Sequence, residues 1–311
     1  ITNEIYKGAS GAHFGPGAIA GAINFITDID YKNSYSLNGY NSKNNSGNIN
    51  FSQILDSDWH LNLKASGLQS NTASAIAKGK ENDKTTNYQF NLNAIKWIND
   101  NLKFRSTIYS RKTIADYDNS STDEHGYVSD NRMHALQTGI QHISKNSETD
   151  IKFHYHNYDR EYENGGYLDE YYSESLVLKG EKGIEINNNF SLGFGSEYKY
   201  DWGNFENRGS YNASTKGHMK DLGMFGNFGY KFKENQILSF YSRFDDHNTT
   251  GLNQTYKISF LQNIDKFSFG LTHSTGLRNP TLYELYGTDN YGIKGNKNLK
   301  PEKSETNELT I

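Results

Sequence analysis

Carboxylate side chains gather in two polar stretches of the sequence, and they are of the type that binds cations. The acidic residues are Glu81 and Asp83 in the first stretch, and Asp116, Asp118, Asp123, Glu124 and Asp130 in the second. A hard cation such as Ca²⁺ takes oxygen ligands of this kind. The two stretches therefore contain enough ligands for calcium, and the alternative is that they are ordinary solvated loop carboxylates.

A second candidate for metal chemistry is the histidine pair His154 and His156. Because alternate residues of an extended strand point to the same face, the two imidazoles could chelate one metal ion. A metal site needs further ligands, which the sequence does not show. We therefore interpret both histidines as residues of a polar strand face.

No combination of residues predicts catalysis, and we expect that the protein is not an enzyme. Its serines do not stand in any motif with the histidine and aspartate that a nucleophilic site requires. The sequence has no cysteine, which excludes a thiolate nucleophile, a thiolate metal site and a disulfide framework. The net charge is −4 with both signs interspersed, so no basic patch predicts binding to nucleic acid.

The elements that must position these side chains are β-strands, as residues 190–202 show most clearly. Large apolar residues such as Phe194 and Trp202 occupy even positions, whereas small or charged residues such as Gly195 and Asp201 occupy odd ones. A period of two places the apolar groups on one face. Such a strand suits a tilted crossing of a bilayer, with lipid on one side and polar filling on the other.

About fourteen segments share this alternation, each comparable to the roughly 10-residue strands of outer-membrane barrels. No run of about 18 apolar residues is present, which excludes a bundle of membrane helices. We predict strands near 31–40, 46–55, 58–70, 86–98, 101–113, 131–144, 149–160, 170–181, 189–202, 218–232, 236–246, 251–263, 266–276 and 303–311.

The connections between these segments alternate in length. Short ones, rich in Asn, Asp, Lys and Gly, fall near 55–58, 98–101, 144–149, 182–188, 233–236 and 264–266. Mostly long ones fall near 70–86, 114–131, 161–169, 203–217 and 277–303. This alternation predicts a barrel with brief turns at the periplasmic rim and extended loops outside, and a soluble sandwich has no reason to sort its loops in this way.

Residues 1–27 differ from the rest of the chain, because glycines recur and small or β-branched residues dominate from Ala18 to Ile26. Their order resembles the end of the plug domain of TonB-dependent outer-membrane receptors. The matching positions are Lys7-Gly8, Phe14-Gly15, Ala18-Ile19-Ala20-Gly21 and Ile23-Asn24-Phe25-Ile26-Thr27. The departures are Lys7 for Arg, Ala9 for Pro, Phe14 for Tyr and Ala20 for Gly. Lys7 weakens the match, because lysine cannot make the forked contacts of arginine.

A second stretch resembles the mid-barrel element of the same receptors. It runs Gly276-Leu-Arg278-Asn-Pro280-Thr-Leu282-Tyr-Glu284-Leu-Tyr-Gly287 and continues at Gly295-Asn296 and Leu299-Lys-Pro301-Glu302-Lys303-Ser304. The two motifs stand in the family's order and have β-strand patterns between them. The resemblance therefore extends over essentially the whole chain.

This resemblance implies an all-β fold, an antiparallel transmembrane β-barrel preceded by the C-terminal end of a plug domain. We expect residues 1–29 to end the plug and residues 31–311 to form the N-terminal part of the barrel. The family barrel has about 22 strands around a plugged lumen. We thus expect an incomplete barrel, about 14 of about 22 strands, with the rest of the plug before Ile1 and about eight strands after Ile311.

The resemblance also implies TonB-dependent active transport of a scarce nutrient across the outer membrane of a Gram-negative bacterium. The implied partners are the TonB-ExbB-ExbD complex, outer-membrane lipid and lipopolysaccharide, and a small-molecule ligand of the cobalamin or ferric siderophore type. The segment that contacts TonB is expected before Ile1, and the ligand-binding residues stay unassigned. The alternatives are a passive porin-like channel, which would lack the plug-like segment, and a barrel enzyme.

Two groups of site residues follow from the resemblance. The cobalamin-receptor branch orders its loops with calcium, and Asp83, Tyr117, Asp118 and Asp130 stand at places similar to its ligands; no other cofactor is expected. Lys7 would lie inside the barrel, where an unpaired charge is costly. We therefore expect Lys7 to pair with Glu302, Glu305 or Glu308, unless it is exposed.

Overall fold

The computed structural model describes residues 2–26, 32–41, 44–55, 58–73, 82–118, 126–209, 212–289 and 292–311. Fourteen of its strands form one antiparallel sheet, in which each strand pairs with the next along the chain. The strands are β3 (Ser34–Tyr40), β4 (Asn44–Leu55), β5 (Trp59–Ala73), β6 (Asn82–Asn99), β7 (Leu102–Asp116), β8 (Tyr127–Ile143), β9 (Ser147–Asn164), β10 (Tyr167–Asn187), β11 (Phe190–Arg208), β12 (Ala213–Lys233), β13 (Gln236–His247), β14 (Gly251–Ile264), β15 (Phe267–Arg278) and β16 (Glu302–Thr310).

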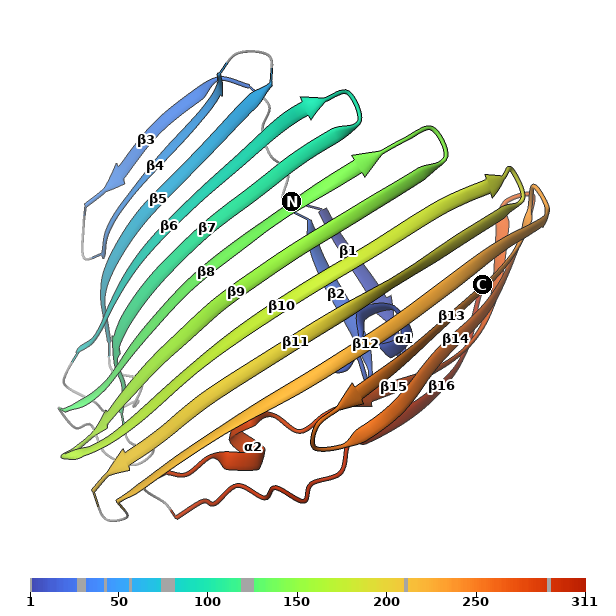
Figure 1. Ribbon diagram of the computed structural model, residues 1–311. Helices are drawn as coiled ribbons and strands as arrows, with labels where there is room; N and C mark the ends of the chain where they lie inside the picture. The colour runs from blue at the N-terminus through green and yellow to red at the C-terminus, as the bar shows by residue number, and fades with distance from the viewer. Residues whose placement is uncertain are drawn as a thin grey trace.

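This sheet confirms the predicted all-β fold and the fourteen predicted strands. It curves strongly, so that it has a concave and a convex side, with β3 and β16 as its edges in the described part of the chain (Figure 1). The barrel does not close, because β3 and β16 do not pair with each other among the described residues.

The strands are longer than predicted at the rim where the long connections were expected. β10 has 21 residues, and its pairing with β11 runs from Leu168–Arg208 to Ile184–Leu192 without a bulge. The predicted loops at 161–169 and 203–217 are therefore wrong, because most of their residues continue the strands. Both faces are polar or mixed there, so the apolar alternation that reveals the membrane strands is missing.

The two faces of the sheet differ as the alternation predicts. Large apolar side chains on the convex side stay exposed, as for Leu178, Phe194 and Met224, which are 50%, 50% and 58% exposed. Asp201 and Arg243, on the concave side, are buried. No helix in the described ranges has the length and apolar content of a membrane span.

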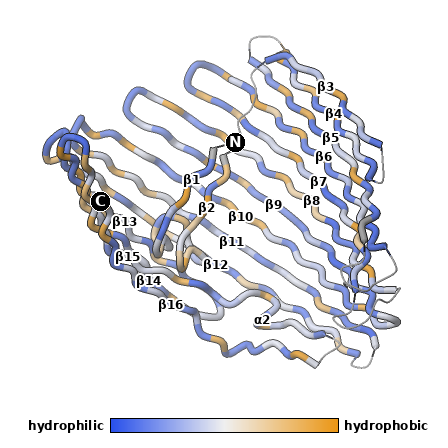
Figure 2. The backbone as a smooth tube through the Cα atoms, turned by 180° about the vertical axis from the view of Figure 1, so that it is seen from behind, coloured by the Kyte–Doolittle hydropathy of each residue, from blue (hydrophilic) through white to orange (hydrophobic). Residues whose placement is uncertain are grey.

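The N-terminal segment, residues 2–26, lies inside the curve of the sheet (Figure 2). It consists of β1 (Thr2–Lys7), the short helix α1 (Gly11–Phe14) and β2 (Gly21–Ile26), and β1 and β2 form a separate antiparallel pair. The α1 end of this hairpin packs against β13, β14 and β15. The predicted boundary between residues 29 and 31 lies outside the described residues.

Candidate functional site: the concave side around the N-terminal segment

The N-terminal segment is fixed to the last two strands mainly by backbone contacts. The Ala9 amide donates to Thr306 Oγ1 at 3.2 Å, and the Gly17 amide donates to the Leu277 carbonyl at 2.7 Å. The Ser304 hydroxyl donates to the carbonyl of Ile19. Gly276 makes this approach possible, since a Cβ there would lie 2.8 Å from Ile19 Cα. The part of the segment around α1, which we call the apex, is therefore held close against the concave side of the sheet, which we call the wall.

An outer compartment of about 450 Å³ lies on the long-connection side of α1. Its floor is Phe14, Pro16 and Gly17, and its cover is the chain from Arg278 to Leu282. The wall carries charged and polar side chains, namely Glu197, Lys199, Asp201, Asp221 and His247.

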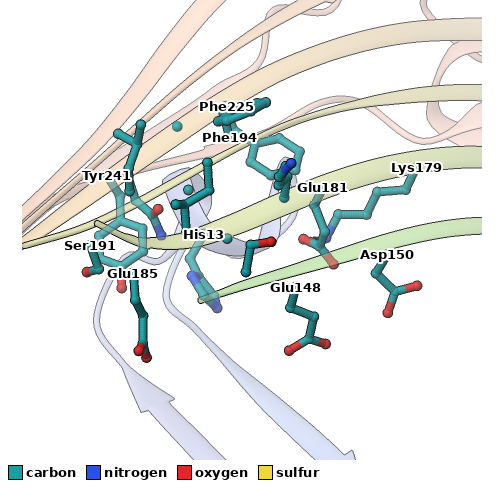
Figure 3. Close-up of a pocket in the computed structure, with 18 of the residues that line it drawn as sticks. His13, Glu148, Asp150, Lys179, Glu181, Glu185, Ser191, Phe194, Phe225 and Tyr241 are labelled. Atoms are coloured by element: carbon teal, nitrogen blue, oxygen red, sulfur yellow. Dashed lines mark ion pairs between the residues drawn. The ribbon is translucent and has the colours of Figure 1, made fainter. Parts of the chain in front are cut away.

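An inner compartment of about 750 Å³ lies on the short-turn side of α1 and is bounded by Ala12, His13 and Phe14 (Figure 3). The His13 ring packs edge-on against Tyr241, with 5.4 Å between ring centroids. Burial, assisted by Lys179, lowers the pKa of His13, so its imidazole is neutral at pH 7. Phe14 lines both compartments, which places α1 between them.

The cover of the outer compartment is anchored by an ion-pair network. Helix α2 (Leu282–Tyr286) begins with a capping box, in which Thr281 and Glu284 exchange hydrogen bonds of 3.2 and 2.7 Å. Arg278 donates to Glu284 at 3.0 Å and to Glu302 at 2.6 Å. The Arg278 guanidinium lowers the pKa of Glu284 to about 2. The network ties α2 to both β15 and β16.

Arg160 is the concave-side cation with the clearest binding geometry. Its guanidinium lies 4.9 Å from the Tyr158 ring centroid and 5.5 Å from that of Tyr162. Its Nε donates to Asn131 Oδ1 at 3.0 Å, and its Nη2 donates to Tyr158 Oη at 2.9 Å. Within the described ranges no carboxylate pairs with Arg160, so its charge is held in place by neutral groups.

Aromatic rings continue from this arginine towards α2. Tyr162 contacts Tyr171 at 6.2 Å, and Tyr171 contacts Tyr283 of α2 at 5.8 Å, measured between ring centroids. Phe205 packs against both Tyr171 and Tyr283. Burial raises the pKa of Tyr283 to about 12, so its phenol stays neutral. The result is an aromatic surface beside Arg160, which has no carboxylate partner among the described residues.

The four predicted calcium ligands are divided between the two faces of the sheet. Asp130 lies on the convex side, where it pairs with Lys112 at 3.1 Å and Arg132 at 2.8 Å. Asp83 has the concave-side parity of β6, and the Tyr117 ring packs on the concave side against Tyr162. Asp118 follows directly after Tyr117. A single ion cannot contact both faces, which removes Asp130 from the predicted set.

Other predicted ligands give no metal site. Among the described residues, no group of three or more His, Asp or Glu side chains is arranged to hold a metal ion. His154 and His156 lie with their ring centroids 6.1 Å apart, and this supports their interpretation as residues of the concave wall. Glu81, Asp123 and Glu124 lie outside the described residues.

Lys7 is exposed, and in the described part of the chain it forms no ion pair with the three predicted glutamates. Glu302 is occupied by Arg278. Glu305 has the convex-side parity of β16 and is 3.9 Å from His273 Nδ1. Glu308 is the nearest of the three to the N-terminal segment, 3.7 Å from where a Cβ on Gly8 would lie. The strand that carries the three glutamates, β16, does contact the N-terminal segment, but it does so through Thr306 and Ser304.

Sequence reasoning did not single out five residues of the concave side, namely Arg160, Tyr162, Tyr171, Phe205 and Arg243. These residues share one signal: each is large or charged and stands at a strand position whose side chain points to the concave side. That signal becomes readable only when the face of each strand is assigned from the apolar residues elsewhere in the same strand.

The comparisons with known proteins agree with this architecture. Residues 21–311 match the family described as "TonB dependent receptor-like, beta-barrel". The chain therefore belongs to the TonB-dependent receptor-like β-barrel family. No curated protein matches the sequence.

Solved structures of similar fold cover nearly the whole chain at low sequence identity. The siderophore receptor PirA from Acinetobacter baumannii has a TM-score of 0.79 and 16% identity, over 99% of this chain and 54% of its own. The ferric-catecholate import receptor Fiu from E. coli K12 has 0.79 and 12%, over 97% and 59%. The copper transporter OprC has 0.79 and 12%, over 99% and 56%. The chain thus spans between half and two thirds of each.

Proposed function

We propose that the complete protein is a TonB-dependent receptor that imports a ferric siderophore across the outer membrane of a Gram-negative bacterium. In this proposal the N-terminal segment is the end of the plug, and the exposed apolar rows of the convex side contact outer-membrane lipid and lipopolysaccharide. The TonB-ExbB-ExbD complex supplies the energy. The family membership supports the transport class, and the convex-side residues support the location.

The observation that carries the ligand assignment is the Arg160 site. A guanidinium that faces the concave side, lies over two tyrosine rings and has no carboxylate partner in the described residues suits an anionic, planar group. Catecholate arms of a ferric siderophore are aromatic and negatively charged. The proposal is therefore a ferric chelate with catecholate-type arms, first held near Arg160 and then passed to the outer compartment.

Cobalamin, the other predicted nutrient, gains no support from this site, because a corrinoid does not require a stacked arginine without a carboxylate partner. The similar structures include siderophore receptors and a copper transporter. At identities of 12–16% these neighbours share the fold, so they support the receptor class rather than the ligand.

The test is uptake by cells that express the full-length receptor, supplied separately with a ferric catecholate, a ferric hydroxamate and cobalamin. We expect uptake of the catecholate alone, abolished when the proton-motive force is collapsed. Uptake that persists without the proton-motive force would favour the passive channel, and uptake of cobalamin would overturn the ligand assignment.

A further inference from the structure

Arg243 of β13 lies directly beneath the apex of the N-terminal segment. Its side chain is 3% exposed, although arginine is rarely buried without a specific partner. The backbone of Gly15, the residue that ends α1, covers the guanidinium: a Cβ built on Gly15 would lie 3.1 Å from Arg243 Cζ. This arginine is therefore enclosed between the wall and the segment.

The wall alone compensates the charge of Arg243. Its Nε donates to Asp245 Oδ1 at 2.7 Å, and its Nη2 donates to Glu197 Oε1 at 2.9 Å, two strands away on β11. Its guanidinium also lies 5.4 Å from the ring centroid of Phe225. All of these partners belong to the fourteen-stranded sheet, and the described N-terminal residues supply no carboxylate to it.

The segment contributes a glycine where a side chain would crowd Arg243. Gly15 has φ +83°, in the left-handed region that favours glycine. Gly17, two residues later, has φ +112°, but a Cβ there would meet nothing within 4 Å. Both glycines thus have a positive φ that favours glycine, and of the two only Gly15 is in close contact with Arg243.

We propose that Arg243 is a positioning residue that seats the apex of the plug, and that its ion pairs remain within the wall when the plug moves. This inference rests on the proposed function, since it assumes that the N-terminal segment is displaced during transport. The contacts broken on displacement are then neutral ones, and they include the hydrogen bonds at Ala9, Gly17 and Ile19, the packing of Gly15 and the contact of the His13 ring with Tyr241. No charge is left unpaired in the wall, because Glu197 and Asp245 keep their arginine.

The test compares Gly15→Ala with Gly17→Ala in the full-length receptor. The readout is leakage of a hydrophilic antibiotic too large for porins into cells without the proton-motive force. We expect a several-fold increase in leakage for Gly15→Ala and little change for Gly17→Ala, because only the former pushes the apex off its seat. Equal leakage of the two variants would overturn the proposal.

A second variant separates contact with Arg243 from backbone strain. In the background Gly15→Ala, the neutral set Arg243→Met, Glu197→Gln and Asp245→Asn removes the guanidinium without leaving unpaired carboxylates. We expect leakage to fall to the level of Gly17→Ala. Leakage that stays high would show that backbone strain at Gly15, rather than Arg243, displaces the apex.

Ionic strength distinguishes this proposal from one in which ion pairs hold the plug in place, because salt would weaken such ion pairs. Because the ion pairs lie within the buried wall, hydrogen exchange of residues 11–17 is expected to be equal in low and high salt. Exchange that accelerates with salt would contradict the proposal. If wild type imports no ferric chelate but the leakage difference persists, the proposed function fails and the seat stands. If wild type imports the ferric chelate but the two glycine variants leak equally, the proposed function stands and the seat at Arg243 fails.

Discussion

Two arginines on the concave side illustrate how one residue type serves two purposes. Arg160, on β9, is held by Asn131 and two tyrosines, and no described carboxylate pairs with it. Arg243, on β13, is 3% exposed and pairs with both Asp245 and Glu197. The comparison separates an arginine whose described neighbours are neutral, as the proposed anion site requires, from one whose charge is already paired within the wall, as the proposed seat requires.

The largest effect is expected from removing Arg243 alone. Arg243→Ala leaves the buried Asp245 and the half-buried Glu197 without their cation, and losing one partner of a buried pair costs about 3–5 kcal/mol. Urea unfolding of the purified receptor in detergent measures this loss. The neutral triple variant Arg243→Met, Glu197→Gln and Asp245→Asn should lose much less, and equal losses would show that Arg243 is not held by its charge.

A smaller and different effect is expected at Arg160. Arg160→Ala should weaken binding of the ferric catecholate about tenfold to a hundredfold, since hydrogen bonds to charged groups contribute about 1.5–3 kcal/mol. Stability in urea should stay near that of the wild type. The matched control is Arg132→Ala, which removes an arginine from the convex side. A control that loses the same affinity would refute the assignment of the ligand to the concave side.

These two arginines also mark what the sequence reveals and what it hides. The strand pattern was readable because residues such as Phe194 and Leu192 alternate with small or charged ones, and alternation depends only on local order. Arg243 and Gly15 are 228 positions apart in the sequence, so their contact depends on how the sheet curves. Glu305 is a predicted partner of Lys7 together with Glu302 and Glu308, yet strand parity places it on the convex side.

The next effect concerns the cover of the outer compartment and its dependence on pH. The pKa of Glu284 is lowered to about 2, so its ion pair stabilises α2 fully above the unfolded value near 4.5 and is lost as pH falls towards 2. Since the Glu284 side chain is 37% exposed, we expect less than about 1 kcal/mol. Protection factors of the amides of residues 282–286, which correct hydrogen exchange for its intrinsic pH dependence, measure this effect between pH 5 and pH 3. Glu284→Gln should show no such dependence.

The smallest effect is expected from calcium, which we propose only for Asp83, Tyr117 and Asp118. Binding would slow hydrogen exchange of residues 82–83 and 116–118 and leave Asp130 unchanged, because Asp130 already pairs with Lys112 and Arg132. Exchange measured with calcium and with a chelator decides the question. Equal exchange in the two conditions would remove calcium from the account of this protein.

The length of the central strands has a further consequence for ligand capture. A membrane crossing requires about 9–11 tilted residues, whereas β10 and β12 have 21 each. Under the proposed function, the surplus residues extend the sheet above the lipid, and their backbone is already hydrogen-bonded before any ligand arrives. Capture there involves little ordering entropy, which favours tight binding of scarce solutes. Epitope insertions should accordingly be tolerated at the Gly165-Gly166 hairpin tip, but not a few residues further down either strand.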